Sequence, residues 1–147
     1  MNHWLEYSAA IEDLYLQMVS PVFKKHGLTF MEFTVLMFLH NNPQYNTASE
    51  IVKYRHLTKS HVSLAVQTLK QKNLIDCQYQ GKDRRSIHLY VQENALEIIQ
   101  DGALAQKEFR AVLHDGLNEE EIERINQYTE HINQNITMYM SKLKEKK

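Results

Sequence analysis

Three positively charged side chains, Lys82, Arg84 and Arg85, stand within four residues of one another in the stretch YQGKDRRSIHLYV. Gly81 precedes them, and apolar and polar residues alternate on both sides, which predicts the tip of a β-hairpin. Ammonium and guanidinium groups make strong charge-assisted hydrogen bonds to phosphates and carboxylates. A cationic turn by itself is more often a solvated loop, so its meaning depends on the segments around it.

The charges of the chain are unevenly distributed along the sequence. The 147 residues carry a formal net charge of -1, but the segment 53–85 holds eight basic and two acidic residues and is therefore +6. The remainder of the chain carries -7. A basic segment within an acidic chain indicates a polyanionic partner that meets one face of the protein.

Two short helices are predicted within this basic segment, before the hairpin. Thr47 and Glu50 form the pattern of a capping box, so a helix should begin there and end near Tyr54. A second helix should begin at Thr58, with apolar residues on one face and polar residues on the other. Because the turn between them is tight, the pair is a helix-turn-helix candidate. The apolar face consists of Val62, Ala65, Val66 and Leu69.

The second helix carries side chains that suit the reading of base edges. In a helix-turn-helix, the N-terminal half of this helix enters the major groove of DNA. Lys59 can pair with guanine acceptors and Gln67 can bridge an adenine, whereas His61 is equally open to being an ordinary exposed residue. The predicted contacts on this helix are Thr58, Lys59, Ser60, His61, Ser63 and Gln67.

Basic residues on both sides of this helix complete the predicted surface. Lys53 and Arg55, on the preceding helix, are candidate contacts to the phosphate backbone. At the hairpin tip, Lys82 adds charge, and Arg84 and Arg85 can enter a narrow minor groove, where negative potential is concentrated.

The hairpin itself is predicted from a change of period from helical to two. Its alternation predicts two strands with one face packed on the helices. Cys77 lies on that inward face, so it is expected to be a small buried thiol rather than a sensor. The inward positions are Ile75, Cys77, Tyr79, Ile87, Leu89 and Val91.

Long apolar stripes lie in the helices predicted at both ends of the chain. The last helix repeats apolar residues every seven positions, which favours a partner helix. Both stripes exceed what a small winged helix can cover, so we expect them to pair with a second copy; packing within a monomer is the alternative. The predicted dimerisation residues are Trp4, Ile11, Met18, Ile125, Ile132, Ile136, Tyr139 and Leu143.

The order of these elements predicts a mainly α fold. It is a winged helix-turn-helix with a two-stranded β wing, flanked by N- and C-terminal dimerisation helices. We divide the chain into an N-terminal dimerisation helix at 1–28, a helix-turn-helix lobe at 29–92, and C-terminal helices at 93–147 that complete the dimerisation region.

This arrangement resembles the MarR family of bacterial transcription regulators over nearly the whole chain. The stretches that carry the resemblance are TASEIVKYRHLTKSHVSLAVQTLKQKNLI, KDRRSIHLYV and HDGLNEEEIERI, and the run Asp83–Arg84–Arg85 looks like the family's Asp-x-Arg wing signature. Two stretches depart from the family pattern. Lys72, Asn73 and Leu74 replace Arg-Gly-Leu, and Val91 and Gln92 replace Leu-Thr, which puts the capping of the following helix in question.

The resemblance implies a homodimeric regulator, expected to be a repressor, that binds pseudo-palindromic operator DNA. The recognition helix would lie in the major groove and the wing in the minor groove. Asp83 would brace the wing by orienting Arg85. A small aromatic or lipophilic effector would bind at the junction between the dimerisation and DNA-binding parts. The alternative is a winged-helix module that binds another protein through its basic face, without specific DNA binding.

Several classes of function find no support in the sequence. No enzyme motif is present, so we expect no catalytic residues. We expect no metal site and no cofactor, since no His or Cys pair has ligand spacing. No apolar run approaches the roughly 20 residues that span a bilayer, and the N-terminus lacks the pattern of a signal peptide. A cytoplasmic location is therefore expected.

Overall fold

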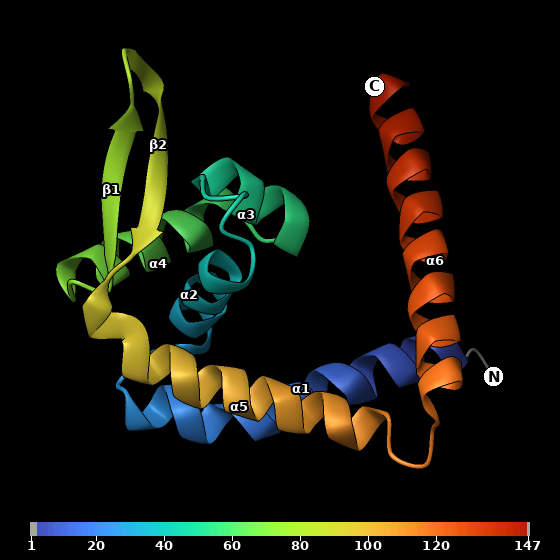
Figure 1. Ribbon diagram of the computed structural model, residues 1–147. Coiled ribbons are helices and arrows are strands. Elements are labelled where there is room, and N and C mark those ends of the chain that lie inside the picture. The colour runs from blue at the N-terminus through green and yellow to red at the C-terminus, as the bar shows by residue number, and fades with distance from the viewer. Residues whose placement is uncertain (1–2, 147) are drawn as a thin grey trace. The chain divides into compact units, whose positions relative to one another are not determined.

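The computed structural model describes residues 3–146, and in that range every side chain except those of Asp83 and Arg84. Figure 1 shows the order of its elements. They are α1 (His3–Lys25), α2 (Phe30–Asn41), α3 (Ala48–Arg55), α4 (Lys59–Gln71), β1 (Ile75–Gln80), β2 (Asp83–Val91), the short 3-10 helix η1 (Glu93–Ala95), α5 (Leu96–Leu113) and α6 (Glu119–Glu145). The mainly helical fold with one antiparallel pair of strands confirms the predicted winged helix-turn-helix.

Local sequence signals set the helix boundaries. At three helix starts, an N-cap side chain accepts a hydrogen bond from the backbone N–H three residues on, and the glutamate at that position accepts a hydrogen bond from the N-cap N–H. Asn73, which stands where the resembled family has glycine, adopts the left-handed backbone after α4, with φ 56°, a conformation that asparagine tolerates. Gln92 makes no side-chain cap bond. The capping pairs are Thr29 with Glu32, Thr47 with Glu50, and Asn118 with Glu121.

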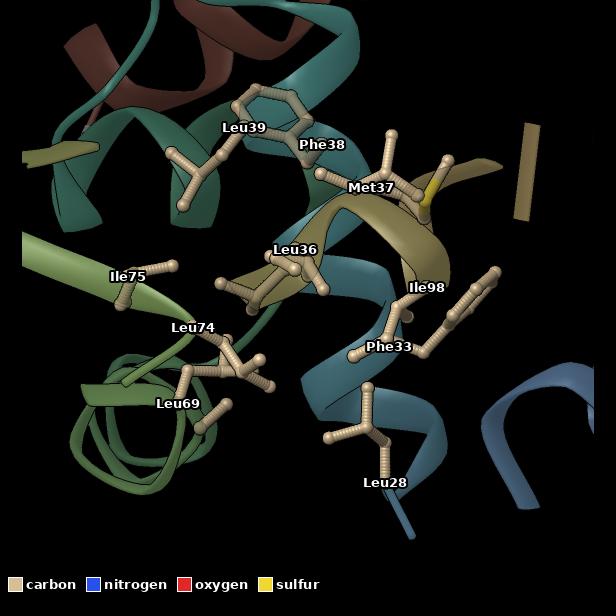
Figure 2. Close-up of a cluster of buried hydrophobic side chains, with 14 of the residues drawn as sticks. Leu28, Phe33, Leu36, Met37, Phe38, Leu39, Leu69, Leu74, Ile75 and Ile98 are labelled. Atoms are coloured by element: carbon tan, nitrogen blue, oxygen red, sulfur yellow. The ribbon is translucent and has the colours of Figure 1, made fainter. Parts of the chain in front are cut away.

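The core forms around α2. This helix is apolar on all sides, and a helix of that kind must be surrounded by other elements. Figure 2 shows its side chains Phe33 and Leu36 among residues from α4, β1 and α5. Gly102 allows α5 to approach α2 closely, because a Cβ there would lie 2.7 Å from the sulfur of Met37.

A buried charge joins the end of α4 to the start of α2. The Glu32 side chain is only 10% exposed, and its Oε2 atom lies 3.3 Å from the Lys72 ammonium. The same ammonium donates a hydrogen bond of 2.8 Å to the Gly27 carbonyl. A buried carboxylate is costly unless it is paired, so Lys72 fixes the end of α4 to the rest of the fold.

Polar contacts also hold α1 beside α5 (Figure 1). Gln106 donates a hydrogen bond of 2.9 Å to the hydroxyl of Tyr15. Lys25 and His26 each lie 2.8 Å from the same carboxylate oxygen of Asp101. The C-terminal half of α1 is therefore attached to α5.

By their contacts, the residues form two compact units, Met1–Phe109 and Arg110–Lys147. The first contains α1 to α4, the wing and most of α5; the second contains α6, which has no buried residue. The division at 1–28, 29–92 and 93–147 stays a prediction. Among the described residues, no helix combines the length and apolarity needed to cross a membrane.

Candidate nucleic-acid interface

The position of α4 is set by its cap and by its apolar face. His56 ends α3 in the left-handed conformation, with φ 51°, which makes the turn short. The Thr58 hydroxyl then accepts a hydrogen bond of 3.3 Å from the backbone N–H of His61. Val62, Ala65 and Leu69 are buried, so the opposite face of the helix must point outward.

The outward face of α4 carries the predicted contacts. Thr58, Lys59, Ser60, His61, Ser63 and Gln67 are all exposed. Thr58 and Ser60 lie close enough to share a hydrogen bond, with 3.4 Å between their hydroxyl oxygens. One residue on this face was not among the predicted contacts: Leu64 is 63% exposed and follows Ser60 by one helical turn.

Helix α3 adds two exposed cations beside α4. Lys53 and Arg55 are both exposed. The Lys53 ammonium lies 5.2 Å from the centre of the Tyr54 ring, a separation at which a cation is attracted to an aromatic face. Tyr54 in turn lies 4.4 Å from the ring of Tyr45, and a hydrogen bond with Tyr54 raises the pKa of Tyr45.

The wing packs on the helices only at its base. Its strands pair antiparallel, with Ile75 opposite Val91 and Tyr79 opposite Ile87. Near the base, Ile75 and Leu89 are buried, but Tyr79 is 54% and Ile87 45% exposed. The prediction that one whole face is packed was therefore wrong for the outer half, because in Figure 1 the hairpin projects beyond the helices that hold it.

The base of the wing is fixed to the segment before α3. The backbone N–H of Leu89 donates a hydrogen bond of 2.8 Å to the Asn46 carbonyl. The Nδ1 atom of His88 lies 2.6 Å from the Asn46 side-chain oxygen. These contacts couple the wing to the N-terminus of α3, and sequence reasoning missed them because the two segments are 42 residues apart.

The tip of the wing carries exposed cations. Gly81 turns the chain with φ 58°. Lys82, in the turn, and Arg85, on β2, are both exposed. The side chains of Asp83 and Arg84 lie outside the described residues. The bracing role of Asp83 and the Arg84 contact therefore stay predictions.

The charge count of the sequence overstates the charge that this surface can offer. Lys72 belongs to the basic segment, but its ammonium is bound to Glu32 and Gly27. Hydrogen bonds from the Gln78 side chain and the Cys77 backbone lower the pKa of Asp76, which keeps this carboxylate charged at the base of β1. Among the described side chains, the exposed cations of α3, the N-terminal half of α4 and the wing tip are Lys53, Arg55, Lys59, Lys82 and Arg85.

Two other groups of residues, a His-Glu-Asp cluster and a cysteine, carry side chains that can do chemistry. Among the described residues, His26, Glu97 and Asp101 form one group with the spacing of metal ligands. The Lys25 ammonium lies 2.8 Å from Asp101 and 3.5 Å from Glu97, so both carboxylates are already paired with a cation of the chain. Cys77 is half-buried and burial raises the pKa of its thiol, so it is a poor nucleophile.

The predicted dimerisation residues differ in their exposure. Trp4 is exposed, whereas Ile11 and Met18 are half-buried within the first unit. All five residues predicted on α6 are exposed, namely Ile125, Ile132, Ile136, Tyr139 and Leu143.

The winged-helix segment and the fold both have known counterparts. A family model described as MarR family matches residues 26–86. A structure described as a MarR-family transcriptional regulator from Listeria monocytogenes complexed with 26-mer DNA has a TM-score of 0.80 and 19% identity, covering 90% of this chain and 87% of that chain. S. aureus MepR in its DNA-binding conformation has a TM-score of 0.79 and 18% identity, covering 92% and 99%.

A third structure, Staphylococcus aureus MarR in complex with salicylate and kanamycin, has a TM-score of 0.73 and 19% identity, covering 92% of this chain and 91% of that chain. No curated protein matches the chain. The matched segment runs from the end of α1 into β2 and so contains the helix-turn-helix described above. Residues 26–86 therefore match the MarR family model, and the chain has the fold of MarR-family structures.

Proposed function

We propose that this protein is a transcription regulator that binds operator DNA through α4 and the wing. The observation that carries the proposal is the outward face of α4, where polar and basic side chains from Lys59 to Gln67 are exposed. Basic residues of α3 and of the wing tip lie exposed on either side of it in sequence. A positive surface of this kind attracts the phosphates of a duplex, and its polar groups can read bases.

Each part of the surface has a distinct role in the proposed complex. The N-terminal half of α4 enters the major groove, where Lys59 can donate to guanine and Gln67 can bridge an adenine. Lys53 and Arg55 contact phosphates without reading sequence. Arg85, together with Lys82, reaches the adjoining minor groove.

The protein acts on DNA as a homodimer in this proposal. The exposed heptad residues of α6 are an apolar stripe that a second copy can cover. A two-fold axis would then present two α4 helices to one face of a duplex, about one turn or 34–36 Å apart. A pseudo-palindromic operator follows from that symmetry.

Regulation by a small ligand completes the proposal. One similar structure contains salicylate, and another is described in terms of the regulation of DNA binding by 6-hydroxynicotinic acid. We propose that this protein is a repressor released from its operator by an aromatic or lipophilic compound. Such a compound must bind one spacing of the two DNA-binding lobes more tightly than the other.

The test is a titration of fluorescently labelled genomic fragments with the full-length protein at several salt concentrations. With several phosphate contacts, the logarithm of the affinity should fall by roughly 0.9 per contact for each log unit of salt. Affinity that does not depend on salt or on the fragment would contradict the proposal. Retention of another protein on immobilised wild type, but not on an Arg55→Ala/Lys59→Ala variant, would then favour the interaction module.

A further inference from the structure

The polar face of α4 contains one apolar side chain at its centre. Leu64 is 63% exposed, the largest exposed fraction among the large hydrophobic residues of α3 and α4. It lies four residues after Ser60 and three before Gln67, so these three side chains are neighbours on one face of the helix. The buried residues of α4 lie on the other side.

Packing of the core gives no reason for a leucine at this position. Its side chain contributes little to the core, since most of its surface remains in water, and single exposed leucines are common on protein surfaces. This leucine differs in its surroundings, because the positions around it carry hydroxyl, amide and basic groups suited to DNA. Its backbone carbonyl accepts a hydrogen bond of 3.1 Å from the Thr68 hydroxyl.

DNA offers one apolar group in the major groove, the C5-methyl of thymine. A side chain between Ser60 and Gln67 would meet base edges rather than phosphates if α4 lies in that groove. We therefore infer that Leu64 reads a thymine by packing against its C5-methyl group. The inference rests on the proposed DNA-binding function and adds a specificity residue to it.

The size of the expected effect follows from the burial of one methyl group. Removing a buried methyl costs about 0.8 kcal/mol, or roughly a fourfold change in affinity. Deoxyuridine differs from thymidine only by this methyl, so it removes the contact and leaves the hydrogen-bonding edges of the base unchanged. Leu64→Ala removes the other partner of the contact and suits an exposed helical site.

The experiment begins with selection of tight-binding duplexes from a randomised pool by the wild-type protein. Each thymidine of the selected duplex is then replaced singly by deoxyuridine, and affinity is measured for wild type, Leu64→Ala and Leu96→Ala. Leu96 is the control because it is 52% exposed and lies on α5. The expected result is a roughly fourfold loss at one thymidine per half-site for wild type and Leu96→Ala, and no loss for Leu64→Ala.

The outcomes separate this inference from the function on which it rests. Salt-sensitive binding with no deoxyuridine effect, or with the same effect in wild type and Leu64→Ala, would overturn the role of Leu64 and leave DNA binding intact. Failure to enrich any duplex would overturn both. If Leu64→Ala had a different oligomeric state in solution from wild type, the residue would belong to a contact between protein copies, and the inference would also be overturned.

Discussion

At the scale of single residues, the exposed side chains of α4 divide into those that attract DNA and those that distinguish its sequences. The sequence pattern predicted the polar contacts, because their helical spacing places them on the face opposite the apolar residues. The same spacing also places Leu64 on the polar face, but a leucine there does not by itself indicate a contact with DNA. The partner of Lys72 could not be predicted, since Glu32 is 40 residues away in the sequence.

Arg85→Ala should weaken the binding of every duplex to a similar degree. The side chain is exposed beside the wing turn. A cation that contacts the DNA backbone or the minor groove contributes to affinity mainly through its charge, whatever the sequence of the duplex. The salt slope measured by fluorescence anisotropy should fall by about 1. Arg110→Ala is the matched control, an exposed arginine on α5, and an equal loss in both variants would contradict a role for the wing.

Gln67→Ala should change base preference rather than overall affinity. A bidentate amide–adenine pair contributes about 1–3 kcal/mol of discrimination at one position. Affinities for duplexes that carry each of the four base pairs at each position would locate the effect. Gln100→Ala, which removes an exposed amide from α5, should leave the preferences unchanged. If the base preferences of Gln67→Ala were also unchanged, Gln67 would not be a contact that reads sequence.

At the scale of elements, the sequence predicts helices better than it predicts the wing. Capping boxes such as Thr29 with Glu32 involve residues three positions apart, so they can be read locally. The outer half of the wing follows the same alternation as its base, but whether a face is covered depends on the tertiary fold. The anchor at Asn46 is likewise invisible locally, because an asparagine before a capping threonine has many uses.

The ion pair of Lys72 should stabilise the docking of α4. Replacement by methionine leaves the buried Glu32 carboxylate without its cation and the Gly27 carbonyl without this donor. We expect Lys72→Met to lower the free energy of unfolding by roughly 1 kcal/mol, a modest value because the lysine is partly solvated. Urea denaturation of wild type and variant measures this difference in the free energy of unfolding. If Lys70→Met, a change at an exposed lysine of the same helix, costs as much, the ion pair is not the cause.

The contact between α1 and α5 should depend on pH through Asp101. Hydrogen bonds from Lys25 and then His26 hold the pKa of this carboxyl below its ordinary value. A lowered pKa contributes stability above the pKa of the unfolded chain, and that stability is lost as pH falls through the lower folded value. The difference in Tm between wild type and Asp101→Asn should therefore be present near neutral pH and shrink at strongly acidic pH. A difference that stays constant would show that ionisation of Asp101 is irrelevant.

At the scale of the whole molecule, the account requires two copies. The apolar stripe of α6 was predicted from its heptad spacing, and its residues are exposed in a single chain. What covers the stripe cannot be derived from one chain, because the answer lies in a second molecule. The dimer accordingly remains part of the proposal.

Ile132→Glu should separate the copies. A charge in the middle of the α6 stripe is costly to bury without a partner. Sedimentation equilibrium should give the mass of a dimer for wild type and of a monomer for the variant, with operator affinity reduced in parallel. Glu130→Gln provides a control at an exposed position of the same helix. A variant that stays dimeric would place the interface elsewhere.

Sequencing of the duplexes that the wild-type protein enriches from a randomised pool tests the central claim most directly. If two α4 helices read one duplex, the enriched sequences will contain an inverted repeat whose half-sites are centred about 10–10.5 base pairs apart, or a multiple of that spacing. An enriched pool with no repeated half-site, or no enrichment at all, would contradict the account.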